Sequence, residues 1–298
     1  MDALSVGAIA AARQVAEAHG ITVREVEVVS DGANLLLHLQ PAPLLARVAT
    51  TTALVRRPVS AWLARDLNIA GFLHAQGVPV VPPSDLLPPG PHVNDGFTMS
   101  FWQYVDHDPN YTVTTQEAAG LLRELHRVLR EYPPSRAAEL PLLGIFDEIT
   151  RWMKFLEGRR ALLGIDLIAL REAHWLLAEK LRYGGENVQP IHGDAHKRNL
   201  LKTPTGLLWT DFEDACIGPA AWDIACMIRT APEGMETALA AYPDAPPWEE
   251  IAPYIEARTL EAVVYWQLQA ERHPEQKREA LERLELWRRG RGATVPVV

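Results

Sequence analysis

Hydrophobic and polar residues alternate along the first hundred residues in a pattern that predicts a small antiparallel sheet. An amphipathic helix opens the chain and continues to Glu17. Three apolar or alternating runs follow, separated by turn residues, at positions 22–29, 35–40 and 44–50. A period of two residues is typical of strands, and turn residues between such runs indicate a meander. The pattern then predicts a helix over residues 58–76, ended by a glycine, and another strand in "GFTMSFWQYV".

The pattern changes to a helical one at Thr114. Thr114 and Glu117 form a capping-box sequence, and apolar residues at helical spacing follow them. Helices are expected from there to the C-terminus, except in residues 189–214, where two short strands surround the turn "TPTG". We therefore predict an α+β fold with two lobes: a small sheet lobe at residues 1–104 and a larger, mainly helical lobe at residues 105–298. A cleft between two such lobes is a usual ligand site.

Composition and charge narrow the classes of function. The 298 residues are 48% hydrophobic and carry a formal net charge of −9, which argues against nucleic acid as the main partner. Most of this charge, −7, falls in residues 106–298. An acidic half could attract a cationic ligand, and ordinary solubility explains the same charge equally well.

Neither the N-terminus nor the cysteines indicate export. The first residues lack the basic start of a signal peptide, and no stretch approaches the length of a membrane span. Cys216 and Cys226 stand ten residues apart, which fits no zinc site. We expect buried thiols in a cytoplasmic protein, with no membrane partner.

One stretch, "QPIHGDAHKRNLLKTPTGLLWTDFED", concentrates side chains that can transfer protons and bind metals. It contains the pattern H-G-D-x-x-x-x-N, followed across the turn by D-F. In phosphoryl transfer, one Asp accepts the proton of the attacking hydroxyl, while an Asn and a second Asp hold Mg²⁺ against the nucleotide phosphates. Asp194, Asn199 and Asp211 fit these three positions.

These residues resemble the aminoglycoside phosphotransferase family, the small-molecule kinases of the protein-kinase-like fold. The family signature H-G-D-x-H-x-x-N with a later D-F is matched from His192 to Phe212, and "PAAWDIA" resembles the next motif, with Asp223 as its acid. The resemblance implies that Asp194 is the catalytic base and that Asn199 and Asp211 bind Mg²⁺. His192 would then shape the catalytic loop, and His196 would lie near the γ-phosphate or be an ordinary loop residue.

The first hundred residues depart from the family pattern. A third-strand Lys usually pairs with a helix Glu there, but no Lys precedes Lys154. Arg47 and Asp66 stand at the corresponding positions, and the resemblance implies that they replace this pair; a strand-edge Arg and a surface carboxylate are the alternative. Arg carries the same charge as Lys with a different reach.

The resemblance also implies contacts with the nucleotide, either ATP or GTP. The turn "SDGAN" would place Gly32 and Asn34 near the phosphates, although it has a single glycine. The segment "MSFWQYV" would offer the purine its backbone, and we assign Met99, Phe101 and Trp102 to this role; the aromatic rings could equally be ordinary packing. Glu213 replaces the usual glycine after D-F, and it could join the metal shell, face the substrate or face solvent.

The acceptor is not fixed by any motif. Several carboxylates are candidate contacts for a cationic acceptor, and for each one a solvated surface position is the simpler explanation: Asp106, Asp108, Glu233, Glu236, Asp244, Glu249, Glu250 and Glu261. We expect transfer of a γ-phosphate to a hydroxyl of an aminoglycoside-like or other antibiotic, a sugar or an amino alcohol.

Three other functions would use parts of the same sequence. A catalytically silent, nucleotide-binding protein is compatible with the missing Lys, but the intact Asp194, Asn199 and Asp211 argue against it. A metal hydrolase would need further histidines near His192. A protein kinase would need an activation segment, and only 11 residues separate Asp211 from Asp223.

Overall fold

The computed structural model describes residues 3–182, 185, 187–229 and 234–290. Its contacts divide the chain into two compact units. The first comprises Met1–Tyr111 and Leu201–Glu213, and the second comprises Thr112–Leu200 and Asp214–Val298. A division at residue 104 remains a prediction of where one functional lobe ends.

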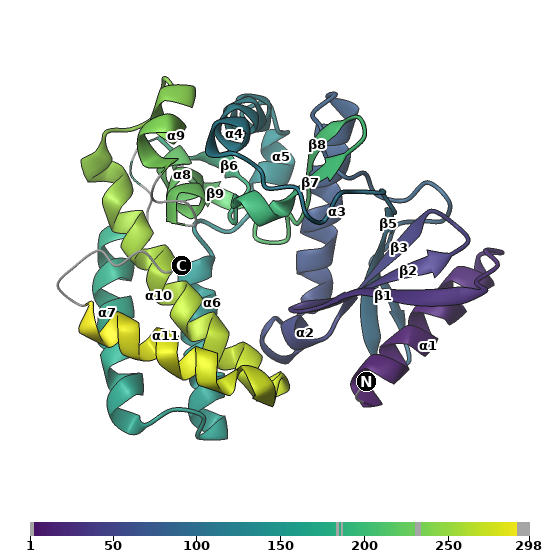
Figure 1. The fold of residues 1–298 in the computed structure, drawn as a ribbon, viewed down its shortest axis with the longest axis horizontal. Helices are drawn as coiled ribbons and strands as arrows, with labels where there is room; N and C mark the ends of the chain where they lie inside the picture. The colour runs from purple at the N-terminus through teal and green to yellow at the C-terminus, as the bar shows by residue number, and fades with distance from the viewer. Residues whose placement is uncertain (1–2, 183–184, 186, 230–233, 291–298) are drawn as a thin grey trace. The chain divides into compact units, whose positions relative to one another are not determined.

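The first unit contains a five-stranded antiparallel sheet (Figure 1). The strand order is β1-β2-β3-β5-β4. The elements of this unit up to residue 111 are α1 (Ala3–Ala18), β1 (Glu25–Asp31), β2 (Asn34–Gln40), β3 (Leu44–Ala49), α2 (Thr51–Val55), α3 (Val59–Ala75), β4 (His92–Asn94) and β5 (Phe97–Gln103). The predicted meander and the two helices are confirmed. The first strand begins at Glu25 rather than residue 22, because its partner β2 ends at Gln40, opposite Glu25.

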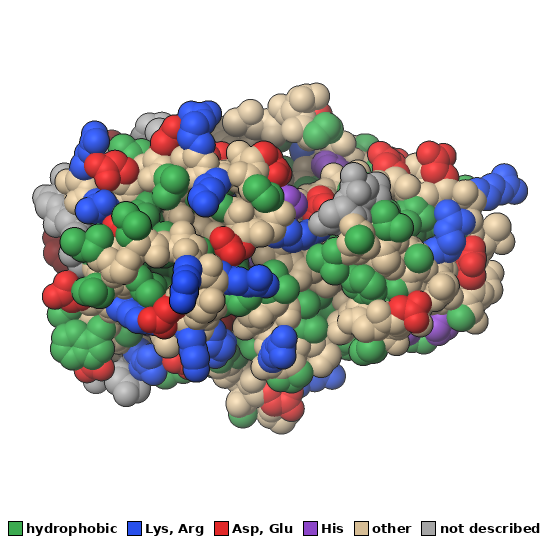
Figure 2. Space-filling model, turned by 90° about the horizontal axis from the view of Figure 1, so that it is seen from below, with side chains coloured by type: hydrophobic (Ala, Val, Ile, Leu, Met, Phe, Trp, Pro, Cys, Tyr) green, Lys and Arg blue, Asp and Glu red, His purple; other side chains and the backbone are tan. Residues whose placement is uncertain are grey.

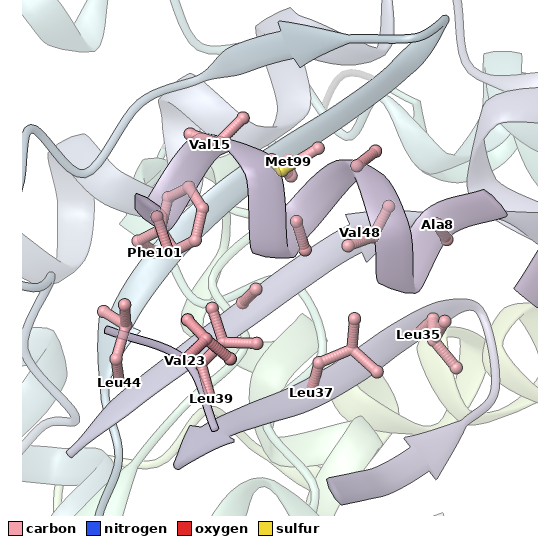
Figure 3. Close-up of a cluster of buried hydrophobic side chains, with 14 of the residues drawn as sticks. Ala8, Val15, Val23, Leu35, Leu37, Leu39, Leu44, Val48, Met99 and Phe101 are labelled. Carbon is pink, nitrogen blue, oxygen red and sulfur yellow. The ribbon is translucent and has the colours of Figure 1, made fainter. Parts of the chain in front are cut away.

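One face of this sheet carries the hydrophobic core of the unit. Leu35, Leu37 and Leu39 alternate along β2 and are fully buried. Figure 3 shows these side chains and those of Met99 and Phe101 between the strands and α1. Alternate residues of a strand point to opposite faces, so this face accounts for the period-two pattern of the sequence.

The opposite face of the sheet carries a charge. Arg47 lies in β3 between Ala46 and Val48, both of which belong to the core cluster under α1. Its side chain therefore points away from α1. It forms an ion pair with Asp66 of α3, which shows that α3 packs against this second face.

A hairpin far along the chain completes the first unit. It consists of β7 (Leu200–Thr203) and β8 (Gly206–Trp209). The backbone of Trp209 bonds to the segment after α3, accepting from Val81 N–H at 2.8 Å and donating to Pro79 at 2.9 Å. These bonds explain why residues 201–213 group with the N-terminal sheet.

The second unit is mainly helical, as predicted (Figure 1). Its elements are α4 (Thr115–Leu129), α5 (Pro134–Ala137), α6 (Ile145–Arg159), α7 (Gly164–Leu181), β6 (Gln189–Ile191), η1 (Lys197–Asn199), β9 (Cys216–Gly218), α8 (Ala220–Arg229), α9 (Met235–Ala241), α10 (Trp248–Arg272), η3 (Pro274–Gln276) and α11 (Lys277–Arg289). The predicted capping box is present: Thr114 Oγ1 accepts from Glu117 N–H, and the Glu117 carboxylate accepts from Thr114 N–H. The two-stranded pairing of β6 with β9 was not predicted, because each strand has only three residues.

The surface is chemically mixed. Basic and acidic side chains are interspersed over the face drawn in Figure 2, with single hydrophobic side chains among them, as is usual for a solvated surface. Within the described residues, no helix has the length and apolar character that a membrane span requires. Cys216 and Cys226 are buried thiols outside any disulfide, as expected.

Candidate active site

Arg47 lies among three carboxylates of the first unit. Its Nη1 atom is 2.6 Å from Asp211 Oδ1, 2.9 Å from Asp66 Oδ2 and 3.6 Å from Glu213 Oε2. The structure therefore brings together the Arg47 and Asp66 that the sequence pattern paired, and adds the Asp of the D-F motif. Burial opposes the charge of Arg47, but these carboxylates outweigh it and raise its pKa.

The three carboxylates differ in their exposure. The side chain of Asp66 is fully buried, and that of Glu213 is 6% exposed, whereas that of Asp211 is 35% exposed. Burial raises the pKa of Asp66 to about 7 against the opposing effect of Arg47, and it also raises the pKa of Glu213. Asp211 is thus the carboxylate of this cluster that is open to a ligand.

The backbone around Asp211 is held in an uncommon conformation. Asp211 has a φ of 71°, in the left-handed region that few residues other than Gly, Asn and Asp adopt. The next residue, Phe212, is fully buried, and its N–H donates to Asp66 Oδ1 at 2.8 Å. Asp66 therefore binds both the cation of β3 and the backbone of the D-F motif, which fixes the direction of the Asp211 side chain.

The Glu213 side chain is buried, so the prediction that it could face solvent is wrong. Its Oε1 atom accepts from Arg56 Nη1 at 2.8 Å, and its Oε2 atom accepts from Asn34 Nδ2 at 2.9 Å. Its main-chain oxygen accepts from Arg65 Nη1 at 3.1 Å. Three side chains of the first unit thus bond to one residue that stands where the family pattern has glycine.

The turn before β2 is tied to the start of α2. Gly32 O accepts from Thr51 Oγ1 at 3.3 Å, and Ala33 O accepts from Thr52 N–H at 3.0 Å. A Cβ atom added at Gly32 would meet nothing within 4 Å, so packing does not require glycine there. The amide of Asn34 is engaged with Glu213. Contact of either residue with phosphate remains a prediction.

The segment assigned to the purine lies within β5. Met99 and Phe101 are fully buried in the core under α1. Phe101 N–H donates to Pro89 O at 2.8 Å, and Phe101 O accepts from Ser84 N–H at 3.0 Å, so both of its backbone groups are engaged. Trp102 lies on the other face, with its ring centroid 5.7 Å from Arg47 Cζ. Their role toward a nucleotide remains a prediction.

The loop of the second unit that carries the H-G-D motif follows β6. Gly193 has a φ of 85°, and a Cβ atom there would lie 1.9 Å from Asp214 O, so only glycine fits between His192 and Asp194. Trp222 Nε1 donates to Gly193 O at 2.7 Å. The loop backbone therefore has one geometry, which directs the Asp194 side chain.

Asp223 fixes this loop from α8. Its carboxylate accepts from His192 N–H at 2.8 Å and from Gly193 N–H at 2.9 Å. Asp223 Oδ2 also lies 2.8 Å from Nε2 of the buried His126, whose Nδ1 lies 2.9 Å from Tyr242 Oη. These bonds hold the backbone of His192 and Gly193 against α8.

Asp194 remains partly accessible, with a side chain that is 21% exposed. Burial raises its pKa, but the nearby His196, Arg258 and His192 outweigh this effect, and the net shift is downward. Its Oδ2 atom lies 3.4 Å from His196 Nε2 and 3.5 Å from Asn199 Nδ2. Burial lowers the pKa of His196, so its ring is neutral at pH 7 beside an ionised Asp194.

Asn199 is oriented by the loop itself. Its Nδ2 donates to the main-chain oxygen of Asp194 at 2.9 Å. The amide nitrogen is thereby engaged, and the amide oxygen is the atom that a metal can use.

Arg258 of α10 is the main partner of Asp194. The buried guanidinium bonds through Nη2 to Asp194 Oδ1 and through Nη1 to Glu261 Oε2, and it lies over Trp222, 5.4 Å from the ring centroid. Burial opposes the Arg258 charge, but Cys226, Glu261 and Asp194 raise its pKa. Burial raises the pKa of Glu261 to about 7 in spite of Arg258.

The other carboxylates considered for the acceptor have simpler positions. Asp106 and Asp108 of the first unit and Glu236, Asp244, Glu249 and Glu250 of the second are exposed. Glu233 lies outside the described residues. Trp222 is buried in the core of its unit and Trp248 is 38% exposed. Glu261 is the one candidate in the described set that packs against the proposed base through a shared partner.

Comparison with protein families decides the assignment. The phosphotransferase enzyme family matches residues 47–254, which include Arg47, the H-G-D loop and the D-F motif. The chain belongs to this phosphotransferase family. The resemblance drawn from the H-G-D-x-H-x-x-N signature is thereby confirmed. No curated protein matches the sequence.

Solved structures of other phosphotransferases share the fold. The GDP and kanamycin complex of APH(2")-IIia is 18% identical, with a TM-score of 0.63 over 91% of this chain and 95% of that chain. The amicoumacin kinase hAmiN with AMP-PNP, Ca²⁺ and Ami is 13% identical, with a TM-score of 0.64 over 92% and 93%. The choline kinase LicA from Streptococcus pneumoniae is 16% identical, with a TM-score of 0.60 over 92% and 98%. These likenesses confirm the two-lobed, kinase-like α+β fold.

The donor atoms of this phosphotransferase suit Mg²⁺. Mg²⁺ binds hard oxygen ligands, commonly one or two from protein side chains and the rest from water and phosphates. Asp211 offers a partly exposed carboxylate, and Asn199 offers an amide oxygen. In the described parts of the chain, no group of three or more His, Cys, Asp or Glu side chains is placed to hold a metal. The fit rests on the chemistry of the two donors, each described within its own unit.

Two arginines of these clusters were missed by the sequence reasoning. Arg56 stands in "VRRPV" and Arg258 stands on a long helix, with Glu261 three residues later. An Arg three residues from a Glu is common on solvent-exposed helices, so the sequence does not show that Arg258 and Glu261 are buried. The sequence did offer one indication: the acidic D-F-E motif needs a nearby cation, and no Lys precedes Lys154, so an Arg would have to supply it.

Proposed function

We propose that this phosphotransferase is a magnesium-dependent small-molecule kinase. It transfers the γ-phosphate of ATP or GTP to a hydroxyl of an antibiotic, a sugar or an amino alcohol. The observation that carries the proposal is the state of Asp194: an ionised, partly exposed carboxylate on a loop whose backbone is fixed by Asp223 and Gly193.

Asp194 accepts the acceptor's proton in the proposed reaction. Its Oδ1 atom is bonded to Arg258, so Oδ2 is the atom that receives the hydroxyl proton. As the hydroxyl oxygen bonds to the γ-phosphorus, the bond from that phosphorus to the bridging oxygen breaks, and the nucleoside diphosphate leaves. A lowered pKa makes Asp194 a weak base, which suits a reaction whose rate depends mainly on positioning and charge stabilisation.

The first unit supplies the nucleotide side of the proposal. Arg47 faces the phosphates in place of Lys, and Asp66 holds it and the D-F backbone in register. Asp211 and Asn199 are the proposed ligands of Mg²⁺, which, when bound, neutralises the phosphate oxygens. Gly32 and Asn34 are proposed to lie near the phosphates, and Met99, Phe101 and Trp102 near the purine.

Among these acceptors, one that also carries a positive charge is proposed. Structural relatives include a kanamycin complex, an amicoumacin kinase and a choline kinase, and choline is a cation with a hydroxyl group. The exposed carboxylates of the second unit can attract such a cation. Fold alone does not fix a substrate, so this part of the proposal depends on direct assay.

Transfer assays with ATP and GTP test the proposal. The purified chain is incubated with Mg²⁺, each nucleotide and a panel of aminoglycosides, other antibiotics, sugars and amino alcohols, and nucleoside diphosphate release is measured. Turnover stimulated by one class identifies the acceptor. The Asp194→Asn variant is the control, because it should lose turnover and keep nucleotide binding.

The second candidate is a nucleotide-binding protein without catalysis. The absence of Lys before residue 154 favours it. Tight, Mg²⁺-dependent nucleotide binding with no turnover across the whole panel would support this second function and contradict the first.

A further inference from the structure

Arg47 lies among three carboxylates, those of Asp66, Asp211 and Glu213. Glu213 also pairs with a second guanidinium, that of Arg56. Arg47 lies within 3.6 Å of all three carboxylates, so each of them competes for it. The proposed function needs Arg47 near Asp211 and the phosphates, and not on Glu213.

Arg56 pairs with one of the competing carboxylates, Glu213. Its Nη1 atom lies 2.8 Å from Glu213 Oε1, closer than Arg47 lies to the same carboxylate. Both side chains of the pair are 6% exposed, so water screens the interaction little. With Glu213 neutralised in this way, Arg47 takes up its shorter contacts with Asp211 and Asp66.

We propose that Arg56 is a positioning residue for phosphoryl transfer: it neutralises Glu213 and so keeps Arg47 directed at Asp211 and the nucleotide. This role rests on the proposed function. In this role, nucleotide binding needs Arg56 because a carboxylate, Glu213, follows the D-F motif. Without the Glu213 carboxylate, Arg47 loses one of its three competing contacts, and we expect nucleotide binding to depend much less on Arg56.

A rescue experiment tests this dependence. Binding of AMP-PNP with Mg²⁺ is measured by calorimetry for the wild type, Arg56→Met, Glu213→Gln and the double variant, with the unfolding temperature of each. Arg56→Met leaves a buried, unpaired Glu213 that attracts Arg47, and we expect binding to weaken about tenfold or more. Glu213→Gln and the double variant should bind within about threefold of the wild type. Arg56→Lys, which keeps the charge, should also bind close to the wild type.

Arg65 provides a matched control. Like Arg56, it lies over the Trp62 ring, at 5.3 Å against 5.7 Å, and it also bonds to Glu213, but through the main-chain oxygen. Any loss in Arg65→Met should therefore persist when Glu213→Gln is added. If Arg56→Met alone does not fold, the double variant, which lacks the unpaired charge, still shows whether Arg56 is dispensable.

The outcomes separate this inference from the proposed function. A double variant that binds as weakly as Arg56→Met would overturn the positioning role, since Arg56 would then act by packing or by touching phosphate directly. Unchanged binding in Arg56→Met would overturn it as well. A wild type that binds no nucleotide in the presence of Mg²⁺ would overturn the proposed function and, with it, the inference.

Discussion

Each unit builds a cluster of carboxylates and arginines, and the two clusters share a design. The first unit groups Asp66, Asp211 and Glu213 around two arginines, and the second groups Asp194 and Glu261 around Arg258. In each cluster one carboxylate is markedly more exposed than the rest. Asp211 is 35% exposed beside partners at 0% and 6%, and Asp194 is 21% exposed beside a partner at 11%.

The clusters differ in how the exposed carboxylate is held. Asp211 is fixed through its own strained backbone and the N–H of the next residue, whereas Asp194 is fixed by Asp223, which binds the backbone just before it. Buried carboxylates thus hold the structure in place, and the exposed one is accessible to a ligand. The difference suits two tasks: a metal ligand beside several charges, and a base whose partner cation occupies one oxygen.

The largest effect should come from removing the base. Asp194→Asn keeps the shape of the side chain but cannot accept a proton, so kcat for transfer should fall about a thousandfold. Asp147→Asn, an exposed carboxylate of the same unit, is the matched control and should change kcat less than twofold. Asp194→Asn turnover equal to the wild type would refute the assignment.

Removing Arg47 should mainly destabilise the first unit. Arg47→Met leaves the fully buried Asp66 without its cation, and the free energy of unfolding should fall by roughly 3 kcal/mol. Asp66→Asn added to Arg47→Met removes the unpaired charge and should recover part of the loss. Urea denaturation of both variants measures this, and equal losses would mean that the pair contributes little.

Glu261 should make stability depend on pH. Burial raises its pKa from an ordinary value of 4.5 to about 7, so the folded state binds this proton more tightly than the unfolded state. Its contribution is therefore present below about pH 4.5 and is lost as the pH rises toward 7. Glutamine does not titrate, so Glu261→Gln lacks this loss. Between about pH 4.5 and pH 7, the free energy of unfolding of the wild type should therefore decrease by roughly 2 kcal/mol more than that of the variant.

Urea denaturation at several pH values measures the Glu261 effect. Identical pH profiles for Glu261→Gln and the wild type would show that Arg258 keeps Glu261 ionised throughout.

The smallest effect should come from His196. Its ring is neutral and lies 3.4 Å from Asp194 Oδ2, too far for a strong bond. His196→Gln should lower kcat by less than about tenfold, since a neutral donor remains in place. A hundredfold loss would instead place His196 in the reaction, as the resemblance allowed.

The sequence predicted the elements that follow a clear period. The alternating leucines of β2 and the capping box at Thr114 specified a strand and a helix start, and both are present. The three-residue strands β6 and β9 could not be predicted, because their pairing depends on contacts between distant segments. The hairpin at residues 200–209 was predicted locally, but its attachment to the N-terminal sheet through Trp209 was not.

The site was predicted where a motif fixes spacing, and it was missed where burial decides. Asp194, Asn199 and Asp211 follow from the signature, and Asp66 stands at the position of the family's helix acid. Arg56 and Arg258 look like surface charges in the sequence. Their partners, Glu213 and Glu261, turn inward only because the surrounding helices and strands enclose them.

The central claim is that Asp211 serves the metal and nucleotide while Asp194 serves the proton. Calorimetric titration of AMP-PNP, with and without Mg²⁺, into the wild type, Asp211→Asn and Asp194→Asn tests it without knowledge of the acceptor. We predict that Mg²⁺ strengthens binding to the wild type and to Asp194→Asn alike, and that Asp211→Asn loses this Mg²⁺ effect. Equal Mg²⁺ effects in the two variants, whether both retained or both lost, would contradict the division of labour between the two clusters.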